Sequence, residues 1–396
     1  MLRSLFSGIS GLKAHQTMLD VAGNNIANVN TTGFKSSQTQ FQDTLSQVLT
    51  NAGAAAVGVG GTNPAQVGLG VRVAGITTNF TQGAAQLTNR STDMMINGDG
   101  FFTVRNGAEN FYTRAGSFNF DSLGQLVTAD GALVQGWAAE NGVVNPNGPL
   151  TDIKLPISTL MGARATESAT YVGNLPADAA DGTELNKAID VYDSLGNRRS
   201  LSLKFTNTAG AWSISATSGA ATSSSMPVTF DATTGAILSP TTFVIGTAPD
   251  NVNVDLSALT GFAGLSTVAA VSQTGQGAGN LQSFSLSPDG TLLGSFSNGL
   301  KQAIGQLSMA TFTNPTGLEK AGGSMYRSTV NSGIAQVGTA GTGGRGKLAG
   351  GSLEMSNVDL SAEFTNLIIA QRGFQANSRV ITTSDELLQE LVNLKR

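Results

Sequence analysis

The side chains most able to do chemistry are few and lie far apart in this sequence. The single histidine, His15, follows an apolar stripe near the N-terminus, and there is no second histidine and no cysteine to complete a metal site with it. The glycine-rich segment GTGGRGK at residues 341–347 lacks the spacing of a phosphate-binding P-loop. We therefore predict no metal ligands and no nucleotide cofactor.

Acid–base and nucleophilic chemistry have no better support. The segment NGDG at residues 97–100 contains one acid, Asp99, whereas a calcium loop needs several oxygen ligands and a terminal glutamate, so we interpret it as a turn. No serine has a histidine partner other than His15, and the carboxylates cannot be paired without a fold. The sequence therefore predicts a protein that is not an enzyme, with no catalytic residues and no cofactor.

Charge and hydrophobicity exclude two classes of partner. Charged residues make up 12% of the chain, against about 25% in typical domains, and the formal net charge is -4. Nothing in this balance directs the chain toward nucleic acid or anionic lipid. No apolar run approaches the ~18 residues that span a bilayer, so we expect no membrane insertion. A surface of low charge, with 50 glycines in 396 residues, suits like copies that pack side by side.

Both ends of the chain carry a seven-residue apolar repeat, which is the pattern of helices that pack along a seam. Near the N-terminus the repeat falls on Leu5, Leu12, Leu19 and Ile26. Gly8, Gly11 and Gly23 interrupt this segment, and each costs roughly 1 kcal/mol of helix stability relative to alanine. We expect this helix to be marginal on its own.

The C-terminal repeat is longer. It predicts a helix over residues 358–394, with Ser356 as its N-cap and Asp359 three residues later. The apolar seam of this helix consists of Leu360, Phe364, Leu367, Phe374, Ile381 and Leu388. One partner helix cannot cover all of its apolar surface, because a second apolar stripe consists of Val380, Leu387, Leu391 and Leu394.

Two interpretations of these stripes compete. An amphipathic helix commonly packs on its own domain, and this is the simpler interpretation for either stripe alone. The stripes lie at opposite ends of a chain whose middle is β-like, and this placement favours a seam between copies. We therefore predict that the apolar residues of the two repeats form a polymerisation seam between copies. These residues are Leu5, Leu12, Leu19, Ile26, Leu360, Phe364, Leu367, Phe374, Ile381 and Leu388.

Between the two stripes, short apolar stretches alternate with turn signals such as DSLG, which occurs at residues 121–124 and again at 193–196. The predicted fold class is mainly β with terminal α-helices, in which nested antiparallel β domains lie between an N-terminal and a C-terminal coiled-coil-like helix. The predicted domains are an inner helical domain over residues 1–28 and 358–396, an extended arm or linker over 29–70, an inner β domain over 71–145 and 278–357, and an outer β domain over 146–277.

Several segments resemble the family of flagellar rod and hook axial proteins. At the N-terminus these are SGISGL at residues 7–12 and NNIANVNTTGFK at 24–35, and near the C-terminus they are LEMSNVD at 353–359 and QRGFQAN at 371–377. The internal segments NGDGFF at 97–102 and YTRAGSF at 112–118 resemble the same family. Within it, VYDSLGN at 191–197 and the extra region after Asn145 resemble hook subunits more than distal rod subunits.

The resemblance implies a structural role. Hook subunits polymerise into a helical tube, with the terminal helices innermost, that acts as a flexible torque-transmitting universal joint between rod and filament. The implied partners are many copies of the same chain, the rod, hook cap and hook-filament junction proteins, and the flagellar type III export apparatus. The implied location is extracellular, in the hook and basal body, and the N-terminus shows no small-residue cleavage site of a secretory signal.

Two alternatives remain at this point. A distal rod subunit of the basal body would share both chain ends but would lack a separately folded outer domain. A secreted β-rich adhesin or enzyme with incidental terminal helices is the alternative from another class of protein, and hydrolytic activity or a bound metal would favour it.

Overall fold

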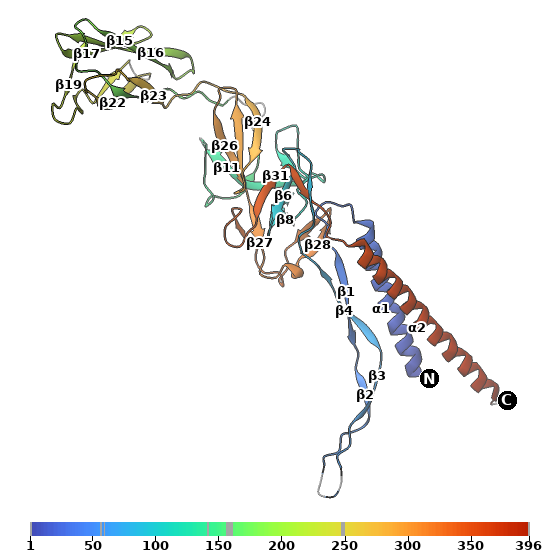
Figure 1. Ribbon diagram of the computed structural model, residues 1–396. Coiled ribbons are helices and arrows are strands. Elements are labelled where there is room, and N and C mark those ends of the chain that lie inside the picture. Colours follow the sequence, from blue (N-terminus) through green and yellow to red (C-terminus); the bar gives the residue numbers. More distant parts are fainter. Residues whose placement is uncertain are drawn as a thin grey trace. The chain divides into compact units, whose positions relative to one another are not determined.

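The computed structural model describes residues 2–55, 58, 60–140, 142–155, 161–246 and 250–394. These residues form many strands between one α-helix at each end, so the predicted class, mainly β with terminal helices, is confirmed (Figure 1). The chain divides into two compact units. Unit 1 contains Met1–Leu155, Ser285–Leu293 and Ala303–Arg396, and unit 2 contains Pro156–Phe284 and Gly294–Gln302.

The terminal helices α1 (Leu2–Ala27) and α2 (Leu360–Leu394) run side by side in unit 1 (Figure 1). The cap of α2 differs from the sequence-based prediction. Asp359, not Ser356, caps the helix, because its Oδ1 accepts hydrogen bonds from the backbone N–H groups of Ser361 at 2.8 Å and Ala362 at 3.2 Å. Ser356 Oγ accepts from the Val358 N–H, which precedes the first residue of α2, Leu360. The side chains of Leu391 and Leu394 lie outside the described residues.

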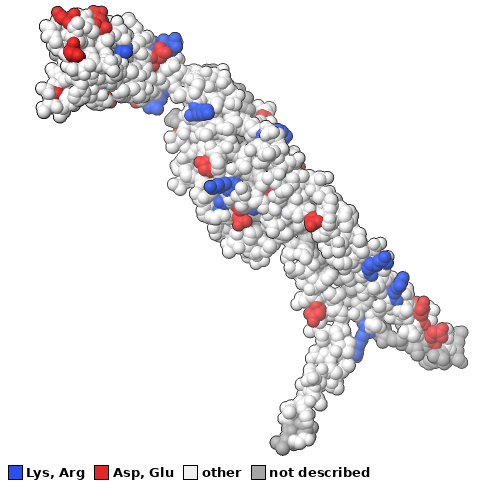
Figure 2. All heavy atoms as spheres, viewed as in Figure 1, with Lys and Arg blue, Asp and Glu red and all other residues white. Residues whose placement is uncertain are grey.

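After α1 the chain forms a long two-stranded ribbon. Strand β1 (Ser37–Asp43) pairs antiparallel with β4 (Val71–Thr78), and β2 (Ser46–Thr50) pairs with β3 (Ala65–Gly68). No residue from position 44 to 71 is charged, and the ribbon is correspondingly pale in Figure 2. The side chains of β2 and β3 are exposed on both faces, so the alternation that normally reveals a strand in a sequence is missing in these two strands.

The ribbon also packs along α1. Ser10 Oγ donates to the Ser7 carbonyl at 2.8 Å and accepts from the Val71 N–H at 3.2 Å. Gly70, with φ +121, lies so close that a Cβ there would be 2.2 Å from Ser10 Oγ. A glycine is therefore needed where the ribbon crosses the helix.

The β body of unit 1 is built on one large sheet. Its central path runs β26 (Lys301–Leu307), β11 (Leu133–Glu140), β7 (Phe101–Asn106), β8 (Glu109–Thr113), β29 (Met325–Arg327) and β28 (Glu319–Gly322). Aromatic rings pack edge to face on it, with Phe101 beside Phe312 and Tyr112 beside Phe312 at centroid distances of 5.9 and 4.8 Å.

The other short elements outside the two sheets of unit 2 follow in chain order. They are β5 (Ala85–Leu87), β6 (Met94–Asn97), β9 (Asn119–Phe120), β10 (Leu126–Val127), β12 (Val143–Val144), β13 (Thr151–Asp152), β24 (Leu281–Leu286), β25 (Thr291–Phe296), β27 (Met309–Thr311), the 3-10 turn Pro315–Gly317, β30 (Gln336–Gly338), β31 (Lys347–Gly350) and β32 (Ser352–Glu354). β32 pairs with β5, which matters for the junction described below, and β31 pairs with β6.

Unit 2 consists of two sheets that enclose one core. The first contains β15 (Glu184–Tyr192), β16 (Arg198–Thr208), β17 (Ala211–Ser218), β18 (Ala221–Thr222), β19 (Met226–Phe230) and β20 (Ile237–Ser239). The second contains β14 (Ser168–Asn174), β21 (Thr242–Ile245), β22 (Val252–Thr260) and β23 (Ala269–Gln273). The core between them includes the fully buried Tyr171, Phe205 and Leu203.

The pairing of unit 2 corrects one sequence-based expectation. β14 and β22 pair in parallel, whereas we predicted antiparallel domains. A parallel pair requires a long crossover, and here the whole first sheet lies in the chain between the two strands. The hairpin turn at DSLG 193–196 does form, because Asp193 Oδ1 accepts from the backbone N–H groups of Leu195 and Asn197 at 3.0 and 2.8 Å.

Candidate functional site

The two terminal helices approach each other closely at glycines. A Cβ built on Gly373 of α2 would lie 2.5 Å from His15 Nε2 of α1, and one on Gly11 would lie 2.6 Å from Asn377 Oδ1. Gly8 faces Ile381, with a corresponding distance of 3.3 Å to Cγ1. Glycines that weaken an isolated helix therefore permit the contact between these two helices. Gly23 is different, since a Cβ there would meet nothing within 4 Å.

This packing buries part of the predicted seam and leaves the rest exposed. Eight of its ten residues are partly buried, and two are exposed, namely Leu360 at 40% and Phe364 at 52%. The partly buried residues are Leu5, Leu12, Leu19 and Ile26 on α1 and Leu367, Phe374, Ile381 and Leu388 on α2. Because α1 and α2 pack together, much of the seam finds its cover within one chain.

Seven large apolar side chains among the described residues of α2 remain uncovered, and we call this set the exposed ridge. Its side chains are each 40–68% exposed. They are Leu360, Phe364, Ile368, Ile369, Val380, Leu387 and Val392. On α1, Phe6 is 63% exposed. The heptad pattern missed Ile368 and Ile369, because they lie off the seven-residue spacing; the second stripe had pointed to Val380 and Leu387.

His15 has a packing role in this structure. Its ring meets Phe41 of the ribbon edge on, with centroids 5.7 Å apart, and lies against Gly373. Its buried Nδ1 has no hydrogen-bond partner. Within the described ranges no group of three or more His, Asp or Glu side chains is arranged to hold a metal ion. Over the same part of the chain, the helices are not apolar enough over a sufficient length to cross a membrane.

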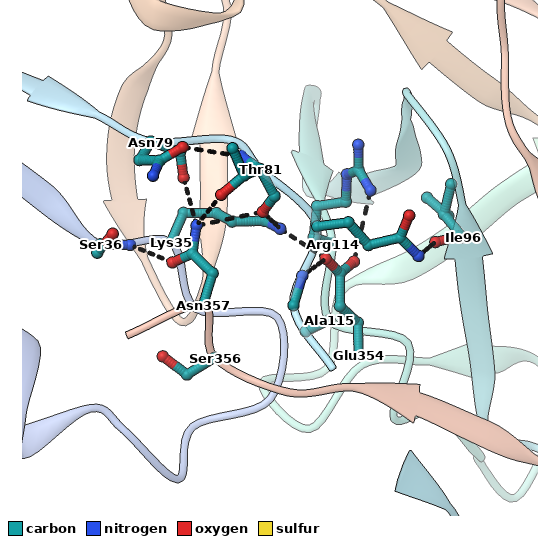
Figure 3. Close-up of polar contacts among 12 residues, drawn as sticks. Lys35, Ser36, Asn79, Thr81, Ile96, Arg114, Ala115, Glu354, Ser356 and Asn357 are labelled. Atoms are coloured by element: carbon teal, nitrogen blue, oxygen red, sulfur yellow. Dashed lines mark hydrogen bonds and ion pairs between the residues drawn. The ribbon is translucent and has the colours of Figure 1, made fainter. Parts of the chain in front are cut away.

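A buried ionic group lies where both chain ends enter the β body (Figure 3). Lys35 Nζ and Glu354 Oε1 are 2.6 Å apart, and both side chains have 0% exposure. Arg114 NH1 lies 3.4 Å from Glu354 Oε2, and its side chain is 3% exposed. One carboxylate thus faces two cations in a nearly water-free site, where charges interact strongly.

Backbone groups complete the partners of this ionic group. Lys35 Nζ also donates to the Thr81 carbonyl at 2.7 Å, and Glu354 Oε1 accepts from the Gly83 N–H at 2.9 Å. Arg114 lies over the Phe101 ring at 5.4 Å, but its Nε has no hydrogen-bond partner. Burial lowers the pKa of Lys35 and the pKa of Arg114, and the neighbouring Glu354 acts against both shifts.

Two asparagines extend the contacts to both helices. Buried Asn25 of α1 exchanges hydrogen bonds with the Ser37 backbone at 2.8 and 3.0 Å, and its Nδ2 donates to Glu363 Oε1 of α2 at 3.0 Å. Asn357 Oδ1 accepts from the Ser36 N–H at 2.8 Å, and its Nδ2 donates to the Asn79 carbonyl at 2.8 Å (Figure 3). We call Asn25, Lys35, Arg114, Glu354 and Asn357 the junction cluster.

Local structure places these side chains. Lys35 follows a turn at Gly33, whose φ of +66 and whose N–H bond to the Glu354 carbonyl at 2.7 Å bring the two segments together. A Cβ at Gly33 would lie 2.5 Å from the Ala115 nitrogen, so only glycine fits there. Arg114 directly follows β8, and Glu354 ends β32, which is held by β5.

Sequence reasoning did not single out the junction cluster as functional. All five residues lie in the segments that carried the family resemblance, at 24–35, 112–118 and 353–359. The available signal was charge, because Lys35, Arg114 and Glu354 are ionisable residues in a chain with only 12% charged residues. Sequence position alone does not reveal which cation faces which carboxylate.

Four family models match the chain. They are "Flagella basal body rod protein" over residues 5–35, "Flagellar hook protein FlgE/F/G D1 domain" over 95–166, "Flagellar basal body protein FlaE D2 domain" over 162–276 and "Flagellar basal body rod FlgEFG protein C-terminal" over 349–394. Together these matches reach both helices, the β body and unit 2.

Curated relatives match along their whole length. The chain is 40% identical to the flagellar hook protein FlgE of Borreliella burgdorferi and 39% identical to that of Treponema pallidum, and each alignment covers 100% of both chains. It is also 36% identical to the flagellar basal-body rod protein FlgG of Bacillus subtilis, with the same coverage.

One solved structure adds evidence on the fold. The crystal structure of the Helicobacter pylori flagellar hook protein FlgE2 superposes with a TM-score of 0.58 and 14% sequence identity. The match covers 68% of this chain and 100% of that one. At this identity the likeness concerns the fold alone.

Proposed function

We propose, on the premise that this chain belongs to the flagellar hook protein family and is a structural subunit of the hook, that neighbouring copies join through the exposed ridge of α2. The family polymerises in the flagellar axial structure, which locates the subunit in the hook and basal body. The observation that carries the proposal is a long helix with one face packed on α1 and seven large apolar side chains left uncovered.

Physical chemistry supports the ridge as the joining surface. Complete burial of a Leu, Ile or Phe side chain is worth roughly 1.5 to 3 kcal/mol, so covering the exposed half of each ridge residue contributes about 1 kcal/mol. The ridge residues extend along α2 from Leu360 to Val392. At about 100° per residue, Leu360, Phe364 and Ile368 share one side of the helix, whereas Ile369 points about 100° away from Ile368. More than one neighbouring copy is therefore needed to bury the whole ridge. Exposed apolar patches of this kind mark sites of protein association.

The wider function that we propose is mechanical. Head-to-tail contacts that do not close into a ring generate a helical tube, and such a tube of hook subunits serves as a flexible, torque-transmitting joint between rod and filament. The separate compact fold of unit 2 supports a hook subunit over a distal rod subunit, although the FlgG relative shares the full length. Sparse surface charge supports sliding between neighbouring copies (Figure 2).

The remaining partners follow from this role. We propose that the rod, the hook cap and the hook-filament junction proteins bind the ends of the tube, and that the flagellar type III apparatus exports the chain to its extracellular position. We also propose that the protein has no catalytic activity, because its chemistry-bearing side chains serve packing and the junction cluster.

The test is a single charge placed on the ridge. Ile368 is 56% exposed, so Ile368→Asp should leave the free subunit folded but place a carboxylate against the next copy. We expect the concentrated variant to form no tubes in electron micrographs, while its thermal unfolding and circular dichroism match those of the parent protein. Phe374→Asp serves a different purpose, because Phe374 lies on the partly buried seam and its loss disturbs the α1–α2 pair itself.

The matched control is Gln371→Glu, which adds a carboxylate to an already polar and exposed position one turn away. We expect this variant to form tubes. Normal tubes from Ile368→Asp would show that the ridge faces solvent in the assembly and would remove the basis of the proposal.

A further inference from the structure

The buried ionic group of the junction cluster has a composition that stability alone does not explain. Lys35, Arg114 and Glu354 bring two cations and one carboxylate into a site with almost no solvent. Apolar side chains of similar size usually stabilise such a site as well as ions do, because removing charges from water costs about as much as their attraction returns. A buried ionic group restricts which arrangements of the chain are stable, because each charge must meet its partner.

The three charges come from three distant segments. Lys35 follows α1, Arg114 follows strand β8 of the body, and Glu354 precedes α2, 319 residues after Lys35. Lys35 and Glu354 also bond the Thr81–Gly83 backbone just beyond the ribbon. Every segment that joins the helices and ribbon to the β body therefore contributes a group to the same site.

We propose that Lys35, Arg114 and Glu354 are positioning residues for assembly: they hold the α1–α2 pair on the β body and allow this attachment only when both chain ends are in place. The inference rests on the proposed function, since it concerns how the ridge is presented to the next copy. It concerns a different set of residues, and none of the three belongs to the ridge.

The energetics of the buried charges predict which substitution does more harm. Without Glu354, Arg114 and Lys35 lose the carboxylate between them. Lys35 must then either remain charged in a buried site or release its proton, and because both cost free energy the site opens more readily. Without Lys35, Glu354 and Arg114 remain as a balanced pair, so the site loses one anchor but no charge is left unpaired. Removal of the carboxylate should therefore do more harm than removal of the lysine.

The experiment compares Glu354→Gln with Lys35→Met in the full chain. Hydrogen exchange on the free subunit measures the opening of the junction at residues 24–37 and 352–363, and electron microscopy of concentrated protein measures tube formation. We expect Glu354→Gln to speed exchange in both segments by roughly a hundredfold while exchange in unit 2 is unchanged, and to form no tubes. Lys35→Met should give a smaller increase in exchange and fewer, shorter tubes.

The matched control is Glu109→Gln. Glu109 pairs with Arg327 in the same β body, but both side chains are at least half exposed, so this loss should alter neither exchange at the junction nor tubes. Normal tubes from Glu354→Gln, or an unchanged junction, would overturn the positioning role without touching the ridge, which Ile368→Asp tests separately. If Glu354→Gln fails to fold, Lys35→Met decides, and normal tubes from it would overturn the proposal.

Discussion

Substitution of Gly373 by alanine tests whether α1 and α2 pack in the free subunit as described. In an exposed helix, Gly→Ala stabilises by up to about 1 kcal/mol because alanine restricts the unfolded chain. At Gly373 the new Cβ would lie 2.5 Å from the His15 ring, which is itself packed on Phe41. Overpacking of this kind costs roughly 1 to 3 kcal/mol. We therefore expect a net loss of up to about 2 kcal/mol in the free energy of opening of the helix pair.

Gly23→Ala is the matched control. Gly23 lies in α1 with nothing within 4 Å of its would-be Cβ, so the variant should gain up to about 1 kcal/mol from helix propensity alone. Hydrogen exchange of the helix amides in the free subunit measures both effects. The double variant His15→Ala/Gly373→Ala removes the clash and should open less readily than Gly373→Ala alone, with an interaction energy between the two sites.

The opposite result has a clear meaning. If Gly373→Ala stabilises α2 as much as Gly23→Ala stabilises α1, the two helices do not touch at this point in the free subunit. The partly buried seam would then be free for neighbouring copies. The division of the apolar surface into a covered seam and an exposed ridge would be wrong.

Three further outcomes follow from the contacts. Phe205→Ala, at a fully buried core position, should lower the unfolding free energy of unit 2 by about 3–5 kcal/mol. As the control, hydrogen exchange of the helix amides in unit 1 should be unchanged. Burial raises the pKa of Tyr171 above its usual value of 10.0, so above about pH 10 the unfolded state loses this proton first and the unfolding free energy of unit 2 falls as the pH rises. In Tyr171→Phe, denaturant titrations at several pH values should show a smaller fall. A fall as steep as in the parent protein would contradict this. Asn25→Ala should speed exchange at Ser37, because both of its backbone bonds are lost, whereas Asn24→Ala at an exposed neighbouring position should not.

Local patterns were sufficient for the elements with a strong period. The seven-residue repeat of Leu12, Leu19 and Ile26 identified α1, because a helix that buries one face repeats its apolar residues at that spacing. Strands β2 and β3 of the ribbon were not predicted, for the converse reason. Their residues are exposed on both faces, so neither face selects apolar side chains.

Glycines show where local reasoning fails. Gly8, Gly11 and Gly373 weaken an isolated helix, and nothing in the sequence distinguishes them from Gly23. Only the packed pair shows that the first three face the opposite helix closely, while Gly23 faces open space. The same limit applied to Ile368 and Ile369, whose exposure depends on which face of α2 meets α1.

The sequence by itself determined the mainly β class, the two terminal helices and the membership of the family, because periodicity and short motifs are local properties of the chain. The tertiary structure decided which residues of the predicted seam are covered, that Asp359 caps α2, and that Lys35, Arg114 and Glu354 share one buried site. The reason is physical: burial and ion pairing depend on distances between segments as far apart as the 319 residues from Lys35 to Glu354, and folding alone sets those distances.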